Sequence, residues 1–213
     1  CHPSMANNEL SGPTVVTFIS KWLQEIPKPN FSYRIIFIPE TIGSITYLSS
    51  NYKEMKKKIF AGFNVSCVGD NRAYSYLPSR DGKTISDLIA KHVLKWIDPN
   101  FIEYSWLDRG SDERQYCAPG IDLPLCTFCR TKFGKYKEYH TSKDNFDVVT
   151  QNGLLGSYKV IKNIIDAFEI GLFPSVNYFC EPQLGKRNLY PNTSTLYSGR
   201  HPAQTRMDIL AYS

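Results

Sequence analysis

The sequence predicts an α/β fold in which a mostly parallel sheet lies between layers of helices. Segments with helical spacing of apolar residues alternate along the chain with short runs of β-branched and aromatic residues. The 213 residues, 42% of them hydrophobic, are enough to bury one large core. In such folds ligands bind beyond the carboxyl ends of the strands, so the loops there are the first candidates for function.

Helices and strands are expected to alternate over most of the chain. Helices are predicted where apolar residues recur every three or four positions, and strands where short β-rich runs end at turn residues. The expected helices cover residues 14–26, 49–57, 85–97 and 151–169. The expected strands cover residues 33–39, 59–69, 102–108 and 123–130. This order favours crossover connections and therefore parallel strand pairs.

Two of these elements carry specific expectations. The run at residues 33–39 is β-branched and aromatic, which is typical of a strand buried on both faces, and it places Glu40 at the carboxyl end of that strand. In the helix at residues 85–97, His92 and Trp96 share a face with apolar residues. We therefore expect His92 at the edge of the core.

The six cysteines match neither a secreted disulfide framework nor a paired zinc knuckle, so buried free thiols are expected. Cys126 and Cys129 form a CxxC motif inside a predicted strand, where their side chains would point to opposite faces. Residues 173–206 are rich in Pro, Asn, Ser, Tyr and Gly, which predicts an ordered surface loop.

Charge and hydropathy narrow the functional classes. The net charge of +5 comes from scattered basic residues, so nucleic-acid binding by this domain is not expected. No apolar stretch approaches the ~20 residues of a membrane span, and no export signal is visible, which predicts a cytoplasmic protein. Because residue 1 is cysteine and not methionine, we expect the chain to be a fragment of a longer protein.

Polar residues gather in four segments beside the expected strands. They are CHPSMANNELSG at residues 1–12, IPETIG at 38–43, DRGSDERQY at 108–116 and KEYHTSKDN at 137–145. Each segment alone has a structural explanation, since Asn and Ser shape turns and Glu40 can cap the helix that follows it. Together, the four segments can build one site.

The combination and order of these segments resemble the zinc exopeptidases of the aminopeptidase type. The resemblance is close to the aminopeptidase-like proteins of bacterial polysaccharide-biosynthesis gene clusters, on the motifs CHPSMAN, PETIGS, VGD, RGSDERQY, PGIDLP, EYHTS and EPQLGKR. It covers residues 1–213 as one aminopeptidase-like α/β domain. In those relatives the domain begins before the first histidine and a winged-helix module follows it, which implies missing parts at both ends.

The resemblance implies roles for individual residues. His2 and His140 look like metal ligands, Asn8 stands in the place of a metal-bridging aspartate, and Glu40 stands in the place of the general base. Zinc accepts imidazole and carboxylate ligands, lowers the pKa of its water towards ~7 and polarises the scissile carbonyl. Glu40 would take the proton of that metal-bound water from within about 3 Å.

Departures from the family pattern indicate one zinc ion instead of two. The two-zinc enzymes have a second glutamate and a later aspartate where this chain has Thr41 and Ser66. Asn8 also lacks the charge of a carboxylate that bridges two cations. Glu9 or Asp70 is a candidate for completing a single-metal shell, although a turn explains Asp70 equally well. Weak or absent metal binding is the alternative.

The remaining candidates concern the substrate. In the relatives the segment around Asp112 lines the substrate pocket, so Arg109, Asp112 and Tyr116 are expected to grip an amino group or a carboxylate. Arg187 is a candidate clamp for an acidic group. The structural alternatives are an exposed salt-bridge network for the first three residues and a solvated loop for Arg187.

The resemblance therefore implies a zinc-dependent aminopeptidase-like hydrolase. Its substrate would be a peptide amino terminus or an aminoacyl group on a sugar. The alternative is a catalytically degenerate ligand-binding module of the same fold, and a purely structural domain is the third possibility.

Overall fold

The computed structural model describes residues 2–171 and residue 186. In chain order the elements are η1 (Ala6–Leu10), α1 (Ser11–Leu23), α2 (Ile42–Lys58), β1 (Gly62–Val65), β2 (Ser75–Leu77), α3 (Ile85–Ile97), β3 (Ile102–Glu103), η2 (Trp106–Asp108), α4 (Glu113–Tyr116), β4 (Leu125–Cys129) and α5 (Gln151–Ile170). The chain divides into two compact units, Cys1–Glu169 and Ile170–Ser213, and nearly all of these elements belong to the first unit.

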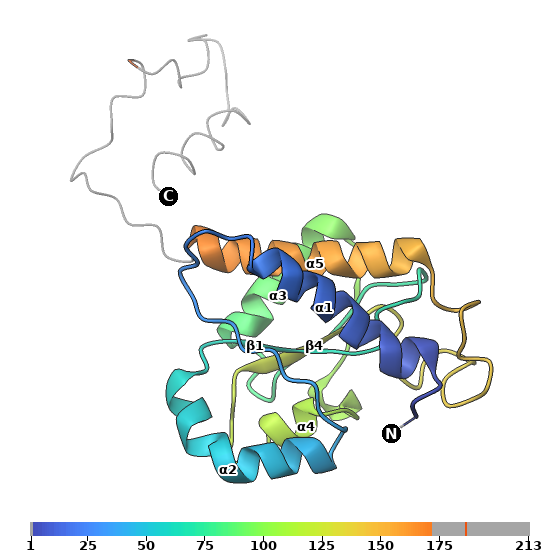
Figure 1. The fold of residues 1–213 in the computed structure, drawn as a ribbon, viewed down its shortest axis with the longest axis horizontal. Coiled ribbons are helices and arrows are strands. Elements are labelled where there is room, and N and C mark those ends of the chain that lie inside the picture. The colour runs from blue at the N-terminus through green and yellow to red at the C-terminus, as the bar shows by residue number, and fades with distance from the viewer. Residues whose placement is uncertain (1, 172–185, 187–213) are drawn as a thin grey trace, which may run out of the picture. The chain divides into compact units, whose positions relative to one another are not determined.

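The fold is a mixed, mostly parallel sheet between two layers of helices, as the sequence predicts. Figure 1 shows α1, α3 and α5 on one side of the sheet and α2 and α4 on the other. The strand order is β1-β4-β2-β3, with β1 parallel to β4, β2 parallel to β3, and β2 antiparallel to β4. Because β1 and β4 are parallel, the segments that follow them leave the same edge of the sheet.

The face of α3 that packs on the sheet differs from the predicted one. His92 and Trp96 are both exposed, Trp96 to 79%, so the core-edge prediction for His92 is wrong. The cause is Asp87, a buried carboxylate that accepts hydrogen bonds from the Tyr76 hydroxyl and from Ser79. Burying this satisfied carboxylate rotates the helix away from the predicted orientation. The buried residues of α3 are Ser86, Asp87, Ile89, Ala90, Val93 and Leu94.

The segment at residues 33–39 is not a strand, so that prediction is also wrong. It lies in the connection between α1 and α2, which crosses in front of β1 in Figure 1. Among the described residues, β1 is an edge strand that pairs with β4 alone. A β-rich sequence favours extended backbone, but only a neighbouring strand can make it part of a sheet. Glu40 consequently follows an unpaired segment and not a strand.

Other boundaries shift without changing the architecture. α2 begins at Ile42, earlier than the expected helix at residues 49–57. The expected strands at residues 59–69 and 102–108 shorten to β1 and β3, and η2 follows the latter. The predicted helices that became α1, α3 and α5, and the strand that became β4, are confirmed.

The described cysteines confirm the expectation of buried free thiols; they are Cys67, Cys117, Cys126 and Cys129. Within the part of the chain that the structure describes, no helix combines the length and the apolar character needed to cross a membrane. The surface loop expected at residues 173–206 lies outside the described residues, apart from Lys186.

α5 approaches the loop after β1 so closely that only glycine fits. A Cβ atom at Gly153 would lie 2.0 Å from the carbonyl oxygen of Gly69 and 2.5 Å from that of Asp70. One turn further along α5, the Ser157 hydroxyl donates to the carbonyl oxygen of Val68 over 2.6 Å. These contacts fix the backbone of the loop against α5.

Gly153→Ala is expected to lower the free energy of unfolding by about 1–3 kcal/mol, because the added methyl group must push α5 away from the loop backbone. Chemical denaturation measures the change. The control is Asn152→Ala on the exposed side of α5, which should change stability by less than about 0.5 kcal/mol. Equal stability of the two variants would contradict the close approach.

Candidate functional site

A cavity of about 770 Å³ opens beside β1, and all four polar segments of the sequence contribute to its wall. The polar lining residues at the carboxyl end of β1 are Asn8, Glu9, Glu40, Ser66, Ser111, Asp112 and Tyr139. The rest of the wall is largely apolar and comes from α1, α5, β1 and residues 31–38. The cavity therefore has a carboxylate-rich part next to an apolar part.

Asp144 joins the amino-terminal segment to the loop that carries His140. Its Oδ1 accepts a hydrogen bond from the Asn7 amide over 2.6 Å, and its Oδ2 accepts one from the Asn8 amide over 3.1 Å. The Tyr136 hydroxyl donates to the same carboxylate over 3.0 Å. Asp144 is buried, so these charged hydrogen bonds act away from bulk water and hold the two segments together.

The two histidines assigned to a metal lie side by side. The ring centroids of His2 and His140 are 4.2 Å apart, and Nδ1 of His2 lies 3.3 Å from Oε1 of Glu9. Tyr139 stacks on His140 at 3.8 Å, and burial raises the pKa of its hydroxyl to about 12. Neither histidine lines the cavity, but Glu9 and Tyr139, which touch them, both do.

Glu40 lies in the cavity wall and has a raised pKa. Burial is the main cause, and the negative charges of Asp112 and Glu9 raise the pKa of the Glu40 carboxyl further. A hydrogen bond with Ser111 and the positive charge of Arg114 oppose the rise. A partly buried carboxyl with a raised pKa in a cavity has the properties of a general base.

Three residues around this part of the cavity hold a left-handed backbone. They are Thr41 with φ +63°, Cys67 with φ +52° and His140 with φ +56°. Asp112 Oδ1 accepts the Thr41 amide over 2.8 Å, and Arg114 donates to the Thr41 hydroxyl over 2.8 Å. Non-glycine residues rarely adopt this conformation, and such strain gathers at functional sites.

Glu113 is a supporting residue that the sequence did not single out. It is fully buried, and its Oε1 accepts the amides of Gly110 and Ser111 over 2.7 and 3.0 Å. Its Oε2 accepts Asn64 and Thr127, which belong to β1 and β4. Glu113 thus ties the loop of Ser111 to the centre of the sheet. The only sign of Glu113 in the sequence was its place next to Asp112. Pairs of acidic residues on a protein surface look the same, so the sequence could not mark Glu113 as buried.

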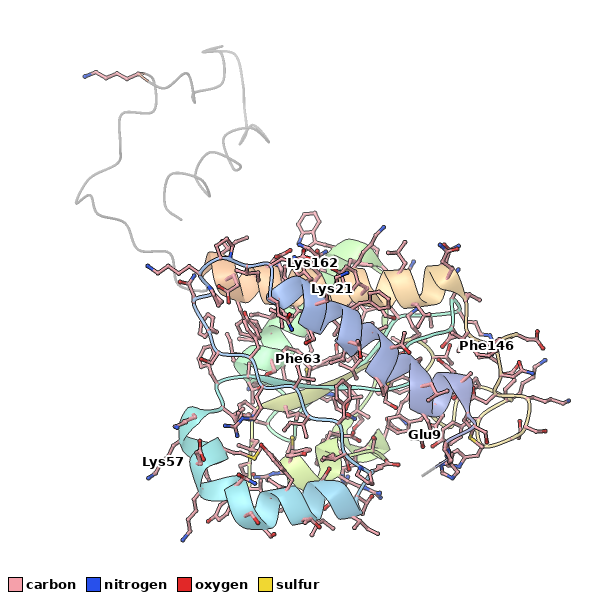
Figure 2. The ribbon with its side chains drawn as sticks, in the orientation of Figure 1. Glu9, Lys21, Lys57, Phe63, Phe146 and Lys162 are labelled. Atoms are coloured by element: carbon pink, nitrogen blue, oxygen red, sulfur yellow. The ribbon has the colours of Figure 1, made fainter. Side chains whose placement is uncertain are left out.

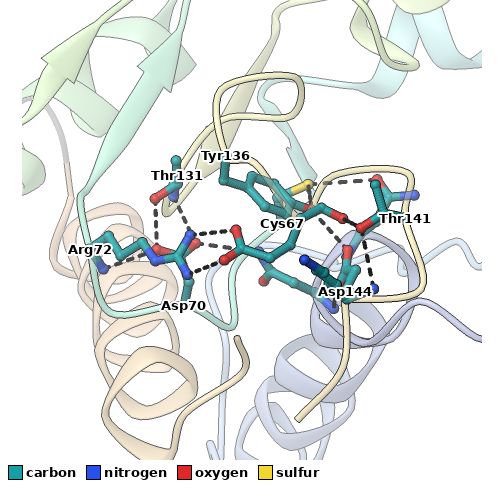
Figure 3. Close-up of polar contacts among 11 residues, drawn as sticks. Cys67, Asp70, Arg72, Thr131, Tyr136, Thr141 and Asp144 are labelled. Carbon is teal, nitrogen blue, oxygen red and sulfur yellow. Dashed lines mark hydrogen bonds and ion pairs between the residues drawn. The ribbon is translucent and has the colours of Figure 1, made fainter. Parts of the chain in front are cut away.

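Asp70 belongs to a structural network and is not directed at the histidines. Its carboxylate accepts the Thr131 amide and hydroxyl over 2.9 and 2.7 Å and the Arg72 amide over 3.0 Å. Arg72 also forms two hydrogen bonds with Glu138, which holds the pKa of that carboxyl at about 2. Figure 3 shows this network beside the contacts of Tyr136 and Asp144. Of the two candidate additional ligands, only Glu9 contacts His2.

The other predicted residues divide between the cavity and its surroundings. Asn8 and Ser66 line the cavity, and Asn8 donates to Glu9 Oε1 over 3.1 Å. Tyr116 and Asp112 also line it. Arg109 does not, because its guanidinium lies over the Trp106 ring at 5.0 Å. Arg187 lies outside the described residues.

The donors beside the cavity suit zinc in their chemical type. His2, His140 and Glu9 offer two imidazoles and one carboxylate, which are groups that zinc accepts. Even so, no set of three or more His, Cys, Asp or Glu side chains within residues 2–171 and 186 is arranged as a metal site. The neutral side chains of Asn8 and Ser66 add no negative charge to these donors.

Comparison with known families decides the membership. Residues 1–171 match the model of DUF4910, which is described as a domain of unknown function. The chain belongs to the DUF4910 family. Residues 173–213 of this DUF4910 chain match a winged helix-turn-helix family. The first match ends at residue 171 and the second begins at residue 173, whereas residues 1–213 were expected to form one domain.

Relatives of this DUF4910 chain confirm the aminopeptidase-like resemblance. A Clostridium acetobutylicum protein, described as a candidate polysaccharide biosynthesis protein with an aminopeptidase-like domain, is 41% identical over 191 residues. The match covers 89% of this chain and 43% of the relative. A crystal structure of a candidate peptidase from the same organism is 41% identical with a TM-score of 0.81, covering 88% of this chain and 44% of that one.

Zinc aminopeptidases share the fold. The enzyme BSAP from Bacillus subtilis matches with a TM-score of 0.63 at 16% identity, over 76% of this chain and 42% of that one. At this identity the likeness shows the fold alone. The DUF4910 chain spans less than half the length of these three relatives.

Asp144→Asn is expected to loosen the amino-terminal segment, because an amide accepts the Asn7 and Asn8 hydrogen bonds more weakly than a carboxylate does. We expect faster hydrogen exchange at these two amides and a loss of about 1–3 kcal/mol in the free energy of unfolding. Asp147→Asn, on the exposed part of the same loop, is the control. Unchanged exchange at both amides in Asp144→Asn would rule out the joining role of Asp144.

Proposed function

We propose that this protein is a zinc-dependent hydrolase of amide bonds in which Glu40 acts as the general base. The observation that supports this most directly is the meeting of four distant polar segments at one part of one cavity. Glu40 lies there close enough to Glu9 and Asp112 for their charges to raise its pKa. Glu9 in turn contacts His2, which lies against His140.

Glu40 would carry the proton through the reaction. As a carboxylate it accepts a proton from the water whose oxygen forms the new bond to the scissile carbonyl carbon. It then returns the proton to the leaving nitrogen as the C–N bond breaks, which yields a carboxylic acid and an amine. The raised pKa suits the first step, because it makes the carboxylate a better proton acceptor.

The carboxylates also favour a substrate with a free amino group. Glu9, Glu40 and Asp112 line the same part of the cavity, and their negative potential attracts an ammonium ion. Tyr116 adds an aromatic surface to the wall. A peptide amino terminus or an aminoacyl group on a sugar has this chemistry, and the description of the C. acetobutylicum relative favours the sugar-linked substrate.

His2 and His140, with Glu9, would hold one zinc ion, which when bound supplies the positive charge that acidifies water and polarises the carbonyl. We propose this activity for the complete polypeptide, in the cytoplasm, with no nucleic-acid partner for the domain expected at residues 1–213. Arg187 would bind an acidic group of the substrate.

A binding module without catalysis is the second candidate. The observation in its favour is the set of neutral residues, Asn8, Thr41 and Ser66, at positions where two-zinc relatives carry acidic ligands. Such a module would bind the same amines in the same cavity. Hydrolysis that is lost with a chelator and restored by zinc would exclude it.

Glu40→Gln is expected to reduce kcat by about 100-fold to 10,000-fold on aminoacyl amides, since the amide cannot accept the proton of water. Steady-state kinetics on a panel of such substrates measures the loss. The control is Glu25→Gln, which changes an exposed residue after α1. Full activity in Glu40→Gln would show that another group is the base.

The acid limb of kcat/KM should report the raised pKa of Glu40. Activity requires the deprotonated carboxylate, so kcat/KM should rise with pH through a pKa above the usual value for glutamate of about 4.3. Asp112→Asn removes a negative charge that raises this pKa, so the limb should move to lower pH. Asp81→Asn, an exposed control, should leave the acid limb in place. If Asp112→Asn also leaves it in place, Asp112 does not act on Glu40.

Zinc affinity tests the histidine pair separately from catalysis. His140→Ala should weaken zinc binding by about 10-fold or more in calorimetry, because an imidazole ligand is lost. His92→Ala, at an exposed position on α3, should leave it unchanged. Asn8→Asp should strengthen binding by adding a negative charge beside Glu9. Equal affinities in all three variants would place any zinc elsewhere.

A further inference from the structure

His140 occupies a strained position in a four-residue turn. The turn comprises residues 138–141, and in it the Thr141 amide donates to the Glu138 carbonyl oxygen over 3.1 Å. His140 is the third residue of the turn and has φ +56°. A positive φ at this position favours Gly or Asn. A histidine there persists only when its surroundings fix the backbone of the turn.

Glu138, the first residue of the turn, is anchored through both its backbone and its side chain. Its carbonyl oxygen accepts the Thr141 hydroxyl over 2.8 Å in addition to the amide. Its carboxylate accepts two hydrogen bonds from the Arg72 guanidinium, over 2.9 and 3.0 Å. The Glu138 side chain is only 9% exposed, and an ion pair with two parallel hydrogen bonds has a defined geometry. Arg72 therefore fixes where the turn begins.

Arg72 is held in turn by the loop after β1. The Asp70 carboxylate accepts the Arg72 amide over 3.0 Å, and the Asn7 side-chain amide donates to it over 3.4 Å. Asp70 is 1% exposed, so these contacts lie inside the protein. Figure 3 shows Arg72 reaching from this loop towards the one that carries Thr141 and Asp144. The ion pair thus connects the turn to the interior and not to a mobile surface.

The loop is fixed on the other side of His140 by Asp144. Besides the carboxylate contacts described above, the carbonyl oxygen of Asp144 accepts an amide of the amino-terminal segment over 3.0 Å. Figure 2 shows Glu9 of that segment and Phe146 of the loop at the same end of the domain. His140 consequently lies between two anchors, Glu138 before it and Asp144 after it.

We propose that Arg72 and Glu138 are positioning residues, whose ion pair holds His140 in the orientation that places its ring beside His2. Neither side chain lines the cavity, so both act through the turn and not on a substrate. The effect on zinc rests on the proposed function, whereas the effect on the orientation of His140 does not. Residues that orient a metal ligand from outside the ligand shell change metal affinity by about 10-fold to 100-fold.

Arg72→Met and Glu138→Gln each remove the ion pair with little change in side-chain size. In calorimetric titration with zinc ions, each variant should bind about 10-fold or more weakly than the unaltered chain, because the turn is no longer held at its first residue. The ring NMR signals of His140 in zinc-free protein should shift or broaden in both variants. A double variant that exchanges the pair, Arg72→Glu with Glu138→Arg, should restore the affinity and the signals.

The matched control is Arg80→Met, which removes another arginine–carboxylate pair, the one with Asp122. That pair is exposed and joins no residue of the turn, so this variant should change neither zinc affinity nor the His140 signals. The ring signals of His92, on the exposed side of α3, serve as the internal control and should stay in place in every variant.

Zinc affinity and His140 signals equal to those of Arg80→Met in both single variants would overturn the proposal. If the single variants do not fold, the exchanged pair decides, because a role limited to folding would restore stability without restoring the signals of His140. If the unaltered chain binds no zinc, the proposed function fails, and the His140 signals then decide the positioning role by themselves.

Discussion

The Asp144 carboxylate is the contact on which the candidate site depends. It accepts two amides from the start of the chain, 136 and 137 residues away in sequence, and it does so while buried. Each hydrogen bond to a charged group contributes about 1.5–3 kcal/mol. Asp144 therefore helps to hold His2, Asn8 and Glu9 beside His140, together with the Asn7 side chain, whose Oδ1 accepts the Gly69 amide over 2.7 Å.

Hydrophobic periodicity and residue propensity predicted those helices and strands whose burial is determined by the local sequence. α1 and α5 follow from the spacing of apolar residues such as Val15, Ile19 and Ile161, because burial of one helix face is a local property of the sequence. The segment at residues 33–39 shows the limit, since its sequence encodes an extended backbone but not a partner. In α3, one buried carboxylate, Asp87, outweighed the apolar pattern that placed His92 at the core.

The site could be predicted only in part, and that part came from a family resemblance and not from periodicity. Its residues come from four loops, and no local pattern says that His2 and His140 approach each other; the resemblance to zinc exopeptidases supplied that expectation, and the geometry agrees with it. Glu113 and Asp144 could not be ranked from sequence as supports. Their importance comes from being buried with every oxygen engaged, and burial of an acidic residue is invisible before the fold is known.

Thr41 shows how contacts around the site offset the cost of a strained backbone. A β-branched residue in left-handed backbone costs about 1–3 kcal/mol, and contacts with Asp112 and Arg114 oppose that cost. Asp112 and Arg114 thus hold the loop next to Glu40 in a strained conformation. A sequence optimised for thermal resistance alone would relax this turn, and in doing so it would release the carboxylate from its fixed orientation.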